Sequence, residues 1–128
     1  MSSNEVDVYS LDVPGLYYID NIHEATDDTI VQLDACPWTR VSTSDNSRQV
    51  QHYGYKYNYA TGNINEACDP IPAFLESYKN LLHHICVQLE LITPTYKFNQ
   101  CIVNNYTQGQ GISAHIDVKK YGAVIGCF

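Results

Sequence analysis

The chain has 128 residues, of which 45% are hydrophobic and 16% are charged. A chain of this length and composition can bury the core of one domain, which excludes a wholly disordered protein. The 14 Asp and Glu residues outnumber the 7 Lys and Arg residues, giving a formal net charge of -7. This acidic balance argues against a protein that binds nucleic acid through a broad basic surface, although a shallow site for one extruded nucleotide stays open.

The first predicted elements lie in the N-terminal third of the chain. We expect residues 1–14 to form a leader and residues 15–128 to form one domain. The segment 15–20 contains Tyr and Ile, which favour strands, and predicts a short strand. Residues 23–35 predict a short helix, because acidic residues come early and apolar residues share one side. These apolar residues are Ile30, Val31 and Leu33.

The segment 48–59, RQVQHYGYKYNY, alternates in character along its length. Alternation predicts one or two half-buried strands, and Gly54 marks a bend between them. Residues 60–69 predict a loop. The residues that carry the alternation are Val50, His52, Tyr57 and Tyr59, and we interpret them as strand packing.

The segment 73–92 predicts the longest helix. Pro70 and Pro72 introduce it, and Pro94 is expected to stop it. Apolar residues recur along it at helical spacing and predict its buried side. They are Phe74, Tyr78, Leu81, Leu82, Ile85 and Leu89.

The C-terminal quarter predicts strands. Residues 97–106 and 112–118 predict two strands that meet at the turn 107–111, and residues 121–128 predict the start of another. With the two helices, these elements indicate an α+β domain that is rich in β-structure.

The cysteines indicate the redox state of the cellular compartment. The chain has 5 of them, an odd number, and no C-x-x-C spacing. We expect reduced thiols, and therefore a cytoplasmic or nuclear protein. The N-terminus is acidic and polar, which does not predict a signal peptide, and no apolar run predicts a membrane span.

His115 and Asp117 are the strongest candidates for a metal site. Residues two apart in a strand point to the same face, so an imidazole and a carboxylate would lie side by side. Non-haem Fe(II) oxygenases bind iron through two His and one carboxylate, and this pair supplies two of the three. The neighbouring predicted strand carries Asn104 and Tyr106, which are suitable hydrogen-bond donors to a ligand with a carboxylate.

Four segments together resemble one family. Residues 104–117, NNYTQGQGISAHID, resemble the N-x-Y-x-x-G-x-x-x-x-x-H-x-D segment of the AlkB family of Fe(II)/2-oxoglutarate dioxygenases. VQHYGYKYNY at 50–59, PIPAFLESYKNLL at 70–82 and FNQCIVNNY at 98–106 resemble the segments that precede it in that family. Order and spacing agree from about residue 15 to residue 128, and the resemblance is strongest to the branch that includes the tRNA wobble-uridine hydroxylase.

The resemblance implies a fold, cofactors and site residues. The implied fold is an incomplete double-stranded β-helix, or jelly-roll, with N-terminal helices. It implies that His115 and Asp117 bind Fe(II), that Asn104 and Tyr106 contact 2-oxoglutarate, and that O2 is the oxidant. The implied reaction is hydroxylation or oxidative demethylation of a nucleic-acid base or a tRNA nucleoside. The residues assigned to the substrate-facing pocket are Arg48, Tyr53 and Tyr55, and for the two tyrosines the alternative of packing in the core or on a strand face stays open.

The sequence departs from the family after the H-x-D. It has no His after His115 and no Arg after Arg48, so the family's second His ligand and its 2-oxoglutarate-binding arginines are expected to fall past Phe128. We interpret the four histidines before His115 as ordinary surface or strand residues. They are His23, His52, His83 and His84.

Two alternatives to an enzyme therefore stay open. One is a catalytically incomplete remnant that acts as a binding or interaction module. The other is a small α+β interaction domain in which the H-x-D match is accidental. In the incomplete barrel an unpaired sheet edge predicts aggregation or a dimer.

Overall fold

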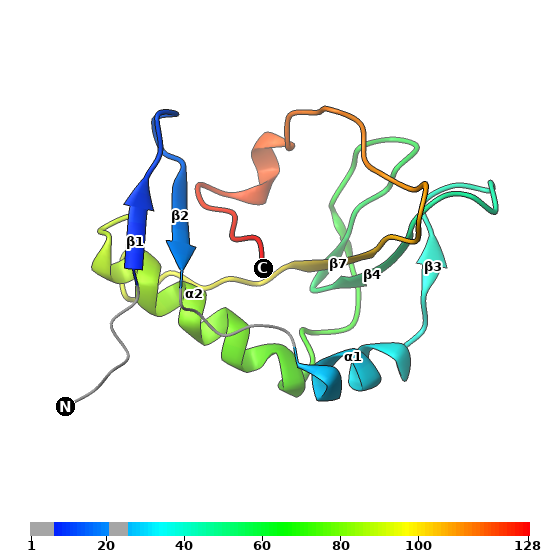
Figure 1. The fold of residues 1–128 in the computed structure, drawn as a ribbon, viewed down its shortest axis with the longest axis horizontal. Coiled ribbons are helices and arrows are strands. Elements are labelled where there is room, and N and C mark those ends of the chain that lie inside the picture. Colours follow the sequence, from blue (N-terminus) through cyan, green and yellow to red (C-terminus); the bar gives the residue numbers. More distant parts are fainter. Residues whose placement is uncertain (1–6, 21–25) are drawn as a thin grey trace.

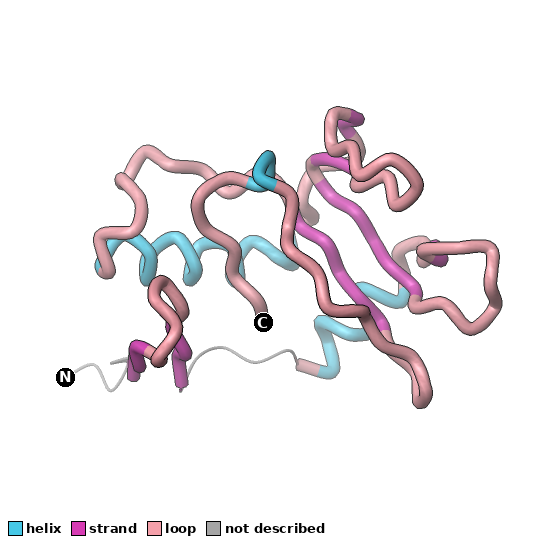
Figure 2. The backbone as a smooth tube through the Cα atoms, turned by 90° about the horizontal axis from the view of Figure 1, so that it is seen from above, coloured by secondary structure: helices cyan, strands magenta, loops and turns pink. Residues whose placement is uncertain are grey.

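A computed structural model describes residues 7–20 and 26–128. The fold is α+β, with small antiparallel sheets and two α-helices (Figures 1 and 2). The strands are β1 (Asp7–Ser10), β2 (Tyr17–Asp20), β3 (Thr39–Arg40), β4 (Gln49–Tyr53), β5 (Tyr55–Lys56), β6 (Glu66–Ala67) and β7 (Cys101–Asn105). The α-helices are α1 (Asp27–Asp34) and α2 (Glu76–Gln88), and the 3-10 helices are η1 (Ala73–Leu75) and η2 (Lys119–Tyr121).

The central sheet has three strands in the order β3-β4-β7, and both neighbours are antiparallel to β4. In its register, Val50 lies opposite Asn104 and Gln51 lies opposite Val103. The two α-helices lie on one side of this sheet, and the segments 57–65 and 107–121, the second of which includes η2, lie on the other (Figure 1). The sheet therefore has a helix face and an open face.

The core lies between the helix face and the helices. Tyr53 of β4, Leu75 of η1 and Tyr78 of α2 form its centre. The partly buried residues that pack against them are Leu33, Ile71, Phe74, Cys101 and Val103. Ile85 and Cys86 are also buried, so the apolar side predicted for the long helix is broadly confirmed.

A buried glutamine joins β4 to α1. Gln51 is only 3% exposed, and its amide nitrogen donates to the carbonyl oxygen of Leu33 over 2.7 Å. Its amide oxygen accepts from the Tyr53 hydroxyl over 2.6 Å. The Leu33 carbonyl, one of the last of the helix, also accepts from the N–H of Cys36 over 3.0 Å, and Gln51 adds a second, shorter hydrogen bond to it from the sheet.

The helix α1 begins at the N-cap Thr26, whose hydroxyl accepts from the backbone N–H of Thr29. The predicted start at residue 23 lies outside the described residues. The predicted apolar side is wrong in part, because Ile30 and Val31 are exposed and the small Thr29 is buried instead. The Thr29 hydroxyl hydrogen-bonds the Tyr78 hydroxyl at 3.2 Å, so a polar contact sets how α1 meets α2.

The helix α2 ends earlier than Pro94 predicts. Its C-cap is Leu89, and Glu90 then takes a positive φ of 59°. The N–H of Glu90 donates to Val87 and the N–H of Leu91 donates to Cys86, which is the Schellman pattern of helix ends. The left-handed residue turns the chain out of the helix before the proline is reached.

The N-terminal residues differ from the prediction of a leader. The strand at 15–20 is confirmed as β2, and β1 pairs with it although it lies inside the predicted leader. Their hairpin carries exposed aromatic rings, and those of Tyr9 and Tyr18 lie 6.2 Å apart. A two-stranded hairpin owes its stability to such cross-strand pairs.

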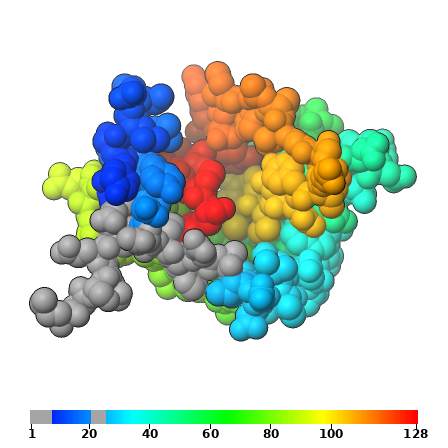
Figure 3. All heavy atoms as spheres, in the orientation of Figure 1, coloured from blue at the N-terminus to red at the C-terminus, as the bar shows by residue number. Residues whose placement is uncertain are grey.

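The C-terminal residues also differ from the prediction. Residues 112–118, all of which the structure describes, form no strand, and 121–128 continue from η2 as irregular backbone. Phe128 instead packs edge-on against Tyr78 of α2, with ring centroids 5.3 Å apart, and Figure 3 shows this end between the β1–β2 hairpin and β7. The small antiparallel sheets of the described residues do not confirm the expected jelly-roll.

Two further findings bear on the expected partners. None of the helices in the described residues is long and apolar enough to cross a membrane. The strand β7 is an edge of the central sheet as described, and the dimer through such an edge stays a prediction.

Gln51→Leu tests the link between the central strand and α1. The Tyr53 hydroxyl would lose its buried acceptor, and the Leu33 carbonyl would lose the shorter of its two hydrogen bonds. We expect the free energy of unfolding in urea to fall by about 1–3 kcal/mol. Gln49→Leu is the matched control, because the Gln49 amide makes only a 3.4 Å contact with Asn105, and it should cost less than about 1 kcal/mol. Equal losses would contradict the special role of Gln51.

Glu90→Gly tests the helix end. Glycine adopts a positive φ without the steric cost that a side chain imposes, so we expect stability to rise by about 0.5–1 kcal/mol. Glu90→Ala removes the same carboxylate but keeps a Cβ, and it should give no such gain. Urea unfolding of both variants makes the comparison, and a gain of the same size in the alanine variant would refute the conformational explanation.

Candidate functional site

The two predicted metal ligands lie together. The Nε2 atom of His115 is 3.3 Å from Oδ1 of Asp117, and each side chain is 49% exposed. The Nδ1 atom of His115 is 2.7 Å from the carbonyl oxygen of Ser113. A carbonyl only accepts, so Nδ1 donates its proton to that oxygen, and Nε2 is the ring nitrogen that faces the carboxylate.

This geometry fits two positions of a metal site. Metal-binding histidines commonly donate their other N–H to a carbonyl or carboxylate, which fixes the ring and the tautomer. Adjacent ligands of an octahedral ion with bonds of about 2.1 Å lie about 3 Å apart, close to the observed separation. Among residues 7–20 and 26–128, however, no group of three or more His, Cys, Asp or Glu is placed to hold a metal ion.

Asn104 and Tyr106 lie on the open face of the central sheet. Asn104 is the fourth residue of β7 and is exposed, and Tyr106 follows the strand with 44% exposure. The Nε–H of Arg48 donates to Oδ1 of Asn104 over 2.9 Å. Since Gln49 pairs with Asn105, Arg48 comes next to Tyr106 across the strands. Three of the predicted site residues are thus brought together.

An aromatic cluster beside Arg48 was not predicted as part of the site. Its centre is Tyr59, whose ring lies 5.5 Å from that of His52, 4.8 Å from that of Tyr57 and 5.5 Å from the Arg48 guanidinium carbon. Tyr121 of η2 joins it, 6.1 Å from Tyr57. The alternation of 48–59 could have placed Arg48 and His52 on one face, but nothing in the sequence pairs that face with residue 121.

The cluster connects the two groups of predicted site residues. Burial raises the pKa of Tyr121 to about 12, and the neighbouring Tyr57, Tyr59 and Asp117 add to the shift. Asp117 is therefore within electrostatic reach of a ring that touches the cluster. The segment 107–121, which carries His115 and Asp117, lies on the open-face side of the sheet (Figure 1).

Two groups inside the cluster are held neutral. Burial lowers the pKa of His52, and the positive charges of Lys56 and Arg48 lower it further. Burial also raises the pKa of Tyr59, against the opposing effect of Arg48. The Nδ1 atom of His52 is buried and has no hydrogen-bond partner among the described residues. Arg48 is consequently the charged group at the centre of this face.

The prediction for Tyr53 is corrected by its position. Tyr53 lies on the helix face, is 7% exposed and donates to Gln51, so its ring fills the core and does not face a substrate. The reason is the period of the strand, which puts Tyr53 on the same face as Gln51. Tyr55 is 39% exposed beyond the bend at Gly54, where φ is 81°, and it pairs with Ala67 of β6. No described contact joins Tyr55 to the aromatic cluster.

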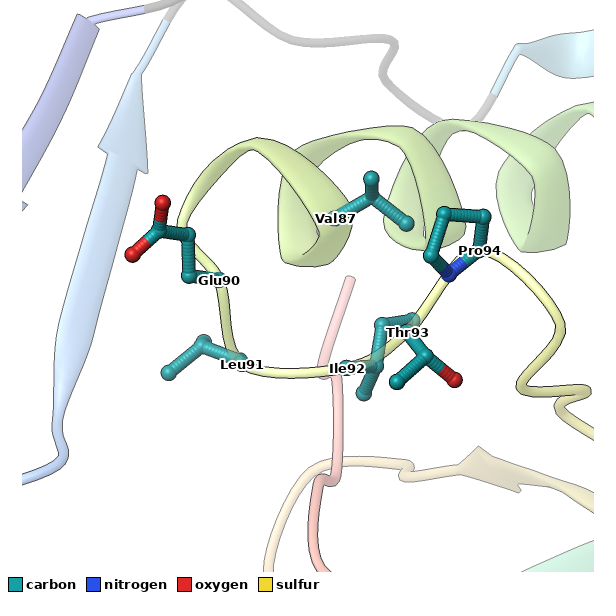
Figure 4. Close-up of a pocket in the computed structure, with 6 residues that line it drawn as sticks. All are labelled: Val87, Glu90, Leu91, Ile92, Thr93 and Pro94. Carbon is teal, nitrogen blue, oxygen red and sulfur yellow. The ribbon is translucent and has the colours of Figure 1, made fainter.

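The pockets of the described residues lie elsewhere. One open pocket of about 460 Å³ lies at the C-terminal end of α2 (Figure 4). It is lined by Val87, Glu90, Leu91, Ile92, Thr93 and Pro94. Another of about 330 Å³ includes Tyr55 and Cys68 but none of the other predicted site residues. The candidate site is thus an open surface and not one of these cavities.

Comparison with known proteins supports the AlkB resemblance at a distance. The chain is 31% identical over 107 residues to the tRNA (carboxymethyluridine(34)-5-O)-methyltransferase alkbh8 of Xenopus tropicalis, covering 81% of this chain and 16% of that protein. It is 26% identical over 111 residues to the alkylated DNA repair protein ALKBH8 homolog of Arabidopsis thaliana, covering 84% of this chain and 31% of that protein. The chain thus spans a minor part of each relative. No family model and no solved structure matches it.

The lowered pKa of His52 predicts a pH dependence of stability. Its ordinary value is 6.5, and a lower value in the folded chain means that protonation favours unfolding. The stability that neutral His52 contributes to the fold is fully present above pH 6.5, and it is lost as the pH falls below 6.5 towards the lower pKa of the folded chain. We expect the free energy of unfolding of His52→Gln to fall less than that of the wild type between about pH 7 and pH 5. Parallel pH profiles would contradict the prediction.

Proposed function

We propose that the chain is the part of an AlkB-type Fe(II)/2-oxoglutarate dioxygenase that holds two metal ligands and the first contacts of the co-substrate. The observation that carries the proposal is the 3.3 Å approach of His115 Nε2 and Asp117 Oδ1, with the other ring nitrogen occupied by a carbonyl. The similarity to proteins named alkbh8, over 81% of the chain, supports it.

In this proposal each residue has one role. His115 offers Nε2 and Asp117 offers a carboxylate oxygen to Fe(II), while Asn104 and Tyr106 donate hydrogen bonds to 2-oxoglutarate. Bound Fe(II), with 2-oxoglutarate and O2, supplies the oxidising power for hydroxylation or oxidative demethylation. The residues themselves bind and orient. The Ser113 carbonyl keeps the His115 ring in the tautomer that can bind metal.

We propose a nucleic-acid base or a tRNA nucleoside as the substrate. Two relatives carry names that refer to a tRNA nucleoside or to DNA repair, which supports this class. The net charge of -7 leaves little for phosphate contacts, and Arg48 is the cation at the centre of the open face. Recognition by this part of the protein would therefore depend on the base more than on the backbone. The cysteines in the structure are all free, which supports a reducing compartment, the cytoplasm or the nucleus.

The alternative is a binding module that does not catalyse. The observation in its favour is that His115 and Asp117 have no third metal-binding side chain beside them in the described ranges 7–20 and 26–128. Two ligands hold a metal ion weakly, because affinity depends on ligand number and on the supporting shell.

An anaerobic titration separates the two. Fe(II) and 2-oxoglutarate are added to the purified chain, and the visible charge-transfer band of the chelated co-substrate is followed. We expect a band in the wild type that is lost in His115→Ala and in Asp117→Ala, because each removes a ligand. His84→Ala, on the exposed side of α2, is the control and should keep the band. A band that persists in both ligand variants would refute the proposed metal site, and its absence from the wild type would favour the binding module.

A further inference from the structure

A side-chain hydrogen bond joins Arg48, in the loop before β4, to Asn104 of the strand β7 at the open face. Arg48 precedes β4, and its Nε–H reaches Oδ1 of Asn104 over 2.9 Å across a sequence separation of 56 residues. Asn104 lies opposite Val50, which is 1% exposed. The paired backbone that carries Asn104 is therefore anchored by Val50, whose side chain is almost completely buried.

The chemistry of this bond fixes the orientation of the Asn104 amide. An arginine side chain has donors and no acceptor, so the amide atom that faces it must be the oxygen. The amide nitrogen then lies on the other side, where its hydrogens point away from Arg48. Tyr106, two residues further along the chain on the same face, carries a second donor in its hydroxyl, and donors suit the oxygen atoms of a carboxylate.

Arg48 is itself held in place by the aromatic cluster. Its guanidinium carbon lies 5.5 Å from the centre of the Tyr59 ring. Tyr59 is fixed in turn by a tilted contact with the His52 ring and an edge contact with the Tyr57 ring. A planar guanidinium can lie on a ring and donate from Nε at the same time, whereas the point charge of a lysine has no equivalent geometry.

We infer that Arg48 is a positioning residue, which turns the Asn104 side chain so that its NH2 group faces a carboxylate of the co-substrate. The identity of that ligand, 2-oxoglutarate, rests on the proposed function. The Arg48–Asn104 hydrogen bond is independent of the proposed function. Arg48 acts through Asn104 and does not contact the ligand, and Tyr59 acts through Arg48.

The first test is the Asn104 side chain itself. Its NH2 signals are identified in 15N–1H spectra by their absence from Asn104→Ala. In Arg48→Lys we expect these signals to shift and to show faster motion, because the Nε donor is gone. Arg40→Lys is the matched control, since Arg40 donates to the Ser47 carbonyl over 2.7 Å on the exposed loop before β4. It should leave the Asn104 signals unchanged. Unchanged signals in Arg48→Lys would overturn the inference, whether or not the chain binds 2-oxoglutarate.

The second test is a double-mutant cycle on 2-oxoglutarate binding, measured anaerobically with Fe(II). Arg48→Lys and Asn104→Ala should each weaken binding about tenfold to a hundredfold, the range of a charge-assisted hydrogen bond. In the Asn104→Ala background, Arg48→Lys should have no further effect, because its action passes through the missing amide. Full additivity would mean that Arg48 contacts the ligand directly, and it would overturn the positioning role.

A third variant guards against a general loss of structure. Tyr59→Phe keeps the ring beneath the guanidinium and should retain both the Asn104 signals and the affinity, whereas Tyr59→Leu should reproduce part of the Arg48→Lys effect. An equal loss in both Tyr59 variants would show that the hydroxyl, whose hydrogen bond with Arg48 lowers the pKa of Tyr59, holds Arg48 in place, and it would overturn the role given to the ring. If the wild type binds no 2-oxoglutarate, the proposed function fails, while the spectra of Asn104 still decide the role of Arg48.

Discussion

The hydrogen bonds of Gln51 are the constraint on which the arrangement of the sheet depends. A glutamine on a central strand, 3% exposed, is costly to bury unless its amide is satisfied. Here one end binds the last turn of α1 at Leu33 and the other binds the Tyr53 hydroxyl. These partners exist only if β4 turns this face to the helices. A shift of the strand by one residue would leave the amide unpaired and expose Tyr53.

That choice of face also determines where the candidate site lies. With Gln51 and Tyr53 turned to the helices, the alternate residues Arg48 and His52 must face the other way. The antiparallel register then brings Asn104 to the same face, opposite Val50. The polar side chains of the open face are thus placed by the packing of the helix face, although none of them touches a helix in the described contacts.

Local pattern predicted much of the fold but not its pairing. The helical spacing of 73–92 located α2, and the alternation of 48–59 with Gly54 located β4, the bend and β5. The strand predicted at 112–118 did not form, because a strand exists only where a neighbour completes its hydrogen bonds, and a single sequence does not show the neighbour. For the same reason the alternation could not tell which of its two faces meets the helices. Tyr53 was therefore expected at a substrate and lies in the core, while Tyr59 was expected as packing and lies beneath Arg48.

The two halves of the candidate site differ in how firmly they are held. Asn104 lies on a strand paired along its whole length with β4, and Arg48 fixes its amide. His115 and Asp117 lie on irregular backbone, where the described polar contacts of the His115 ring are local, to the Ser113 carbonyl and to Asp117. Sites on strands hold their side chains more closely than sites on irregular backbone. The donors for a carboxylate are thus preorganised by the sheet, whereas the imidazole and carboxylate are organised by each other.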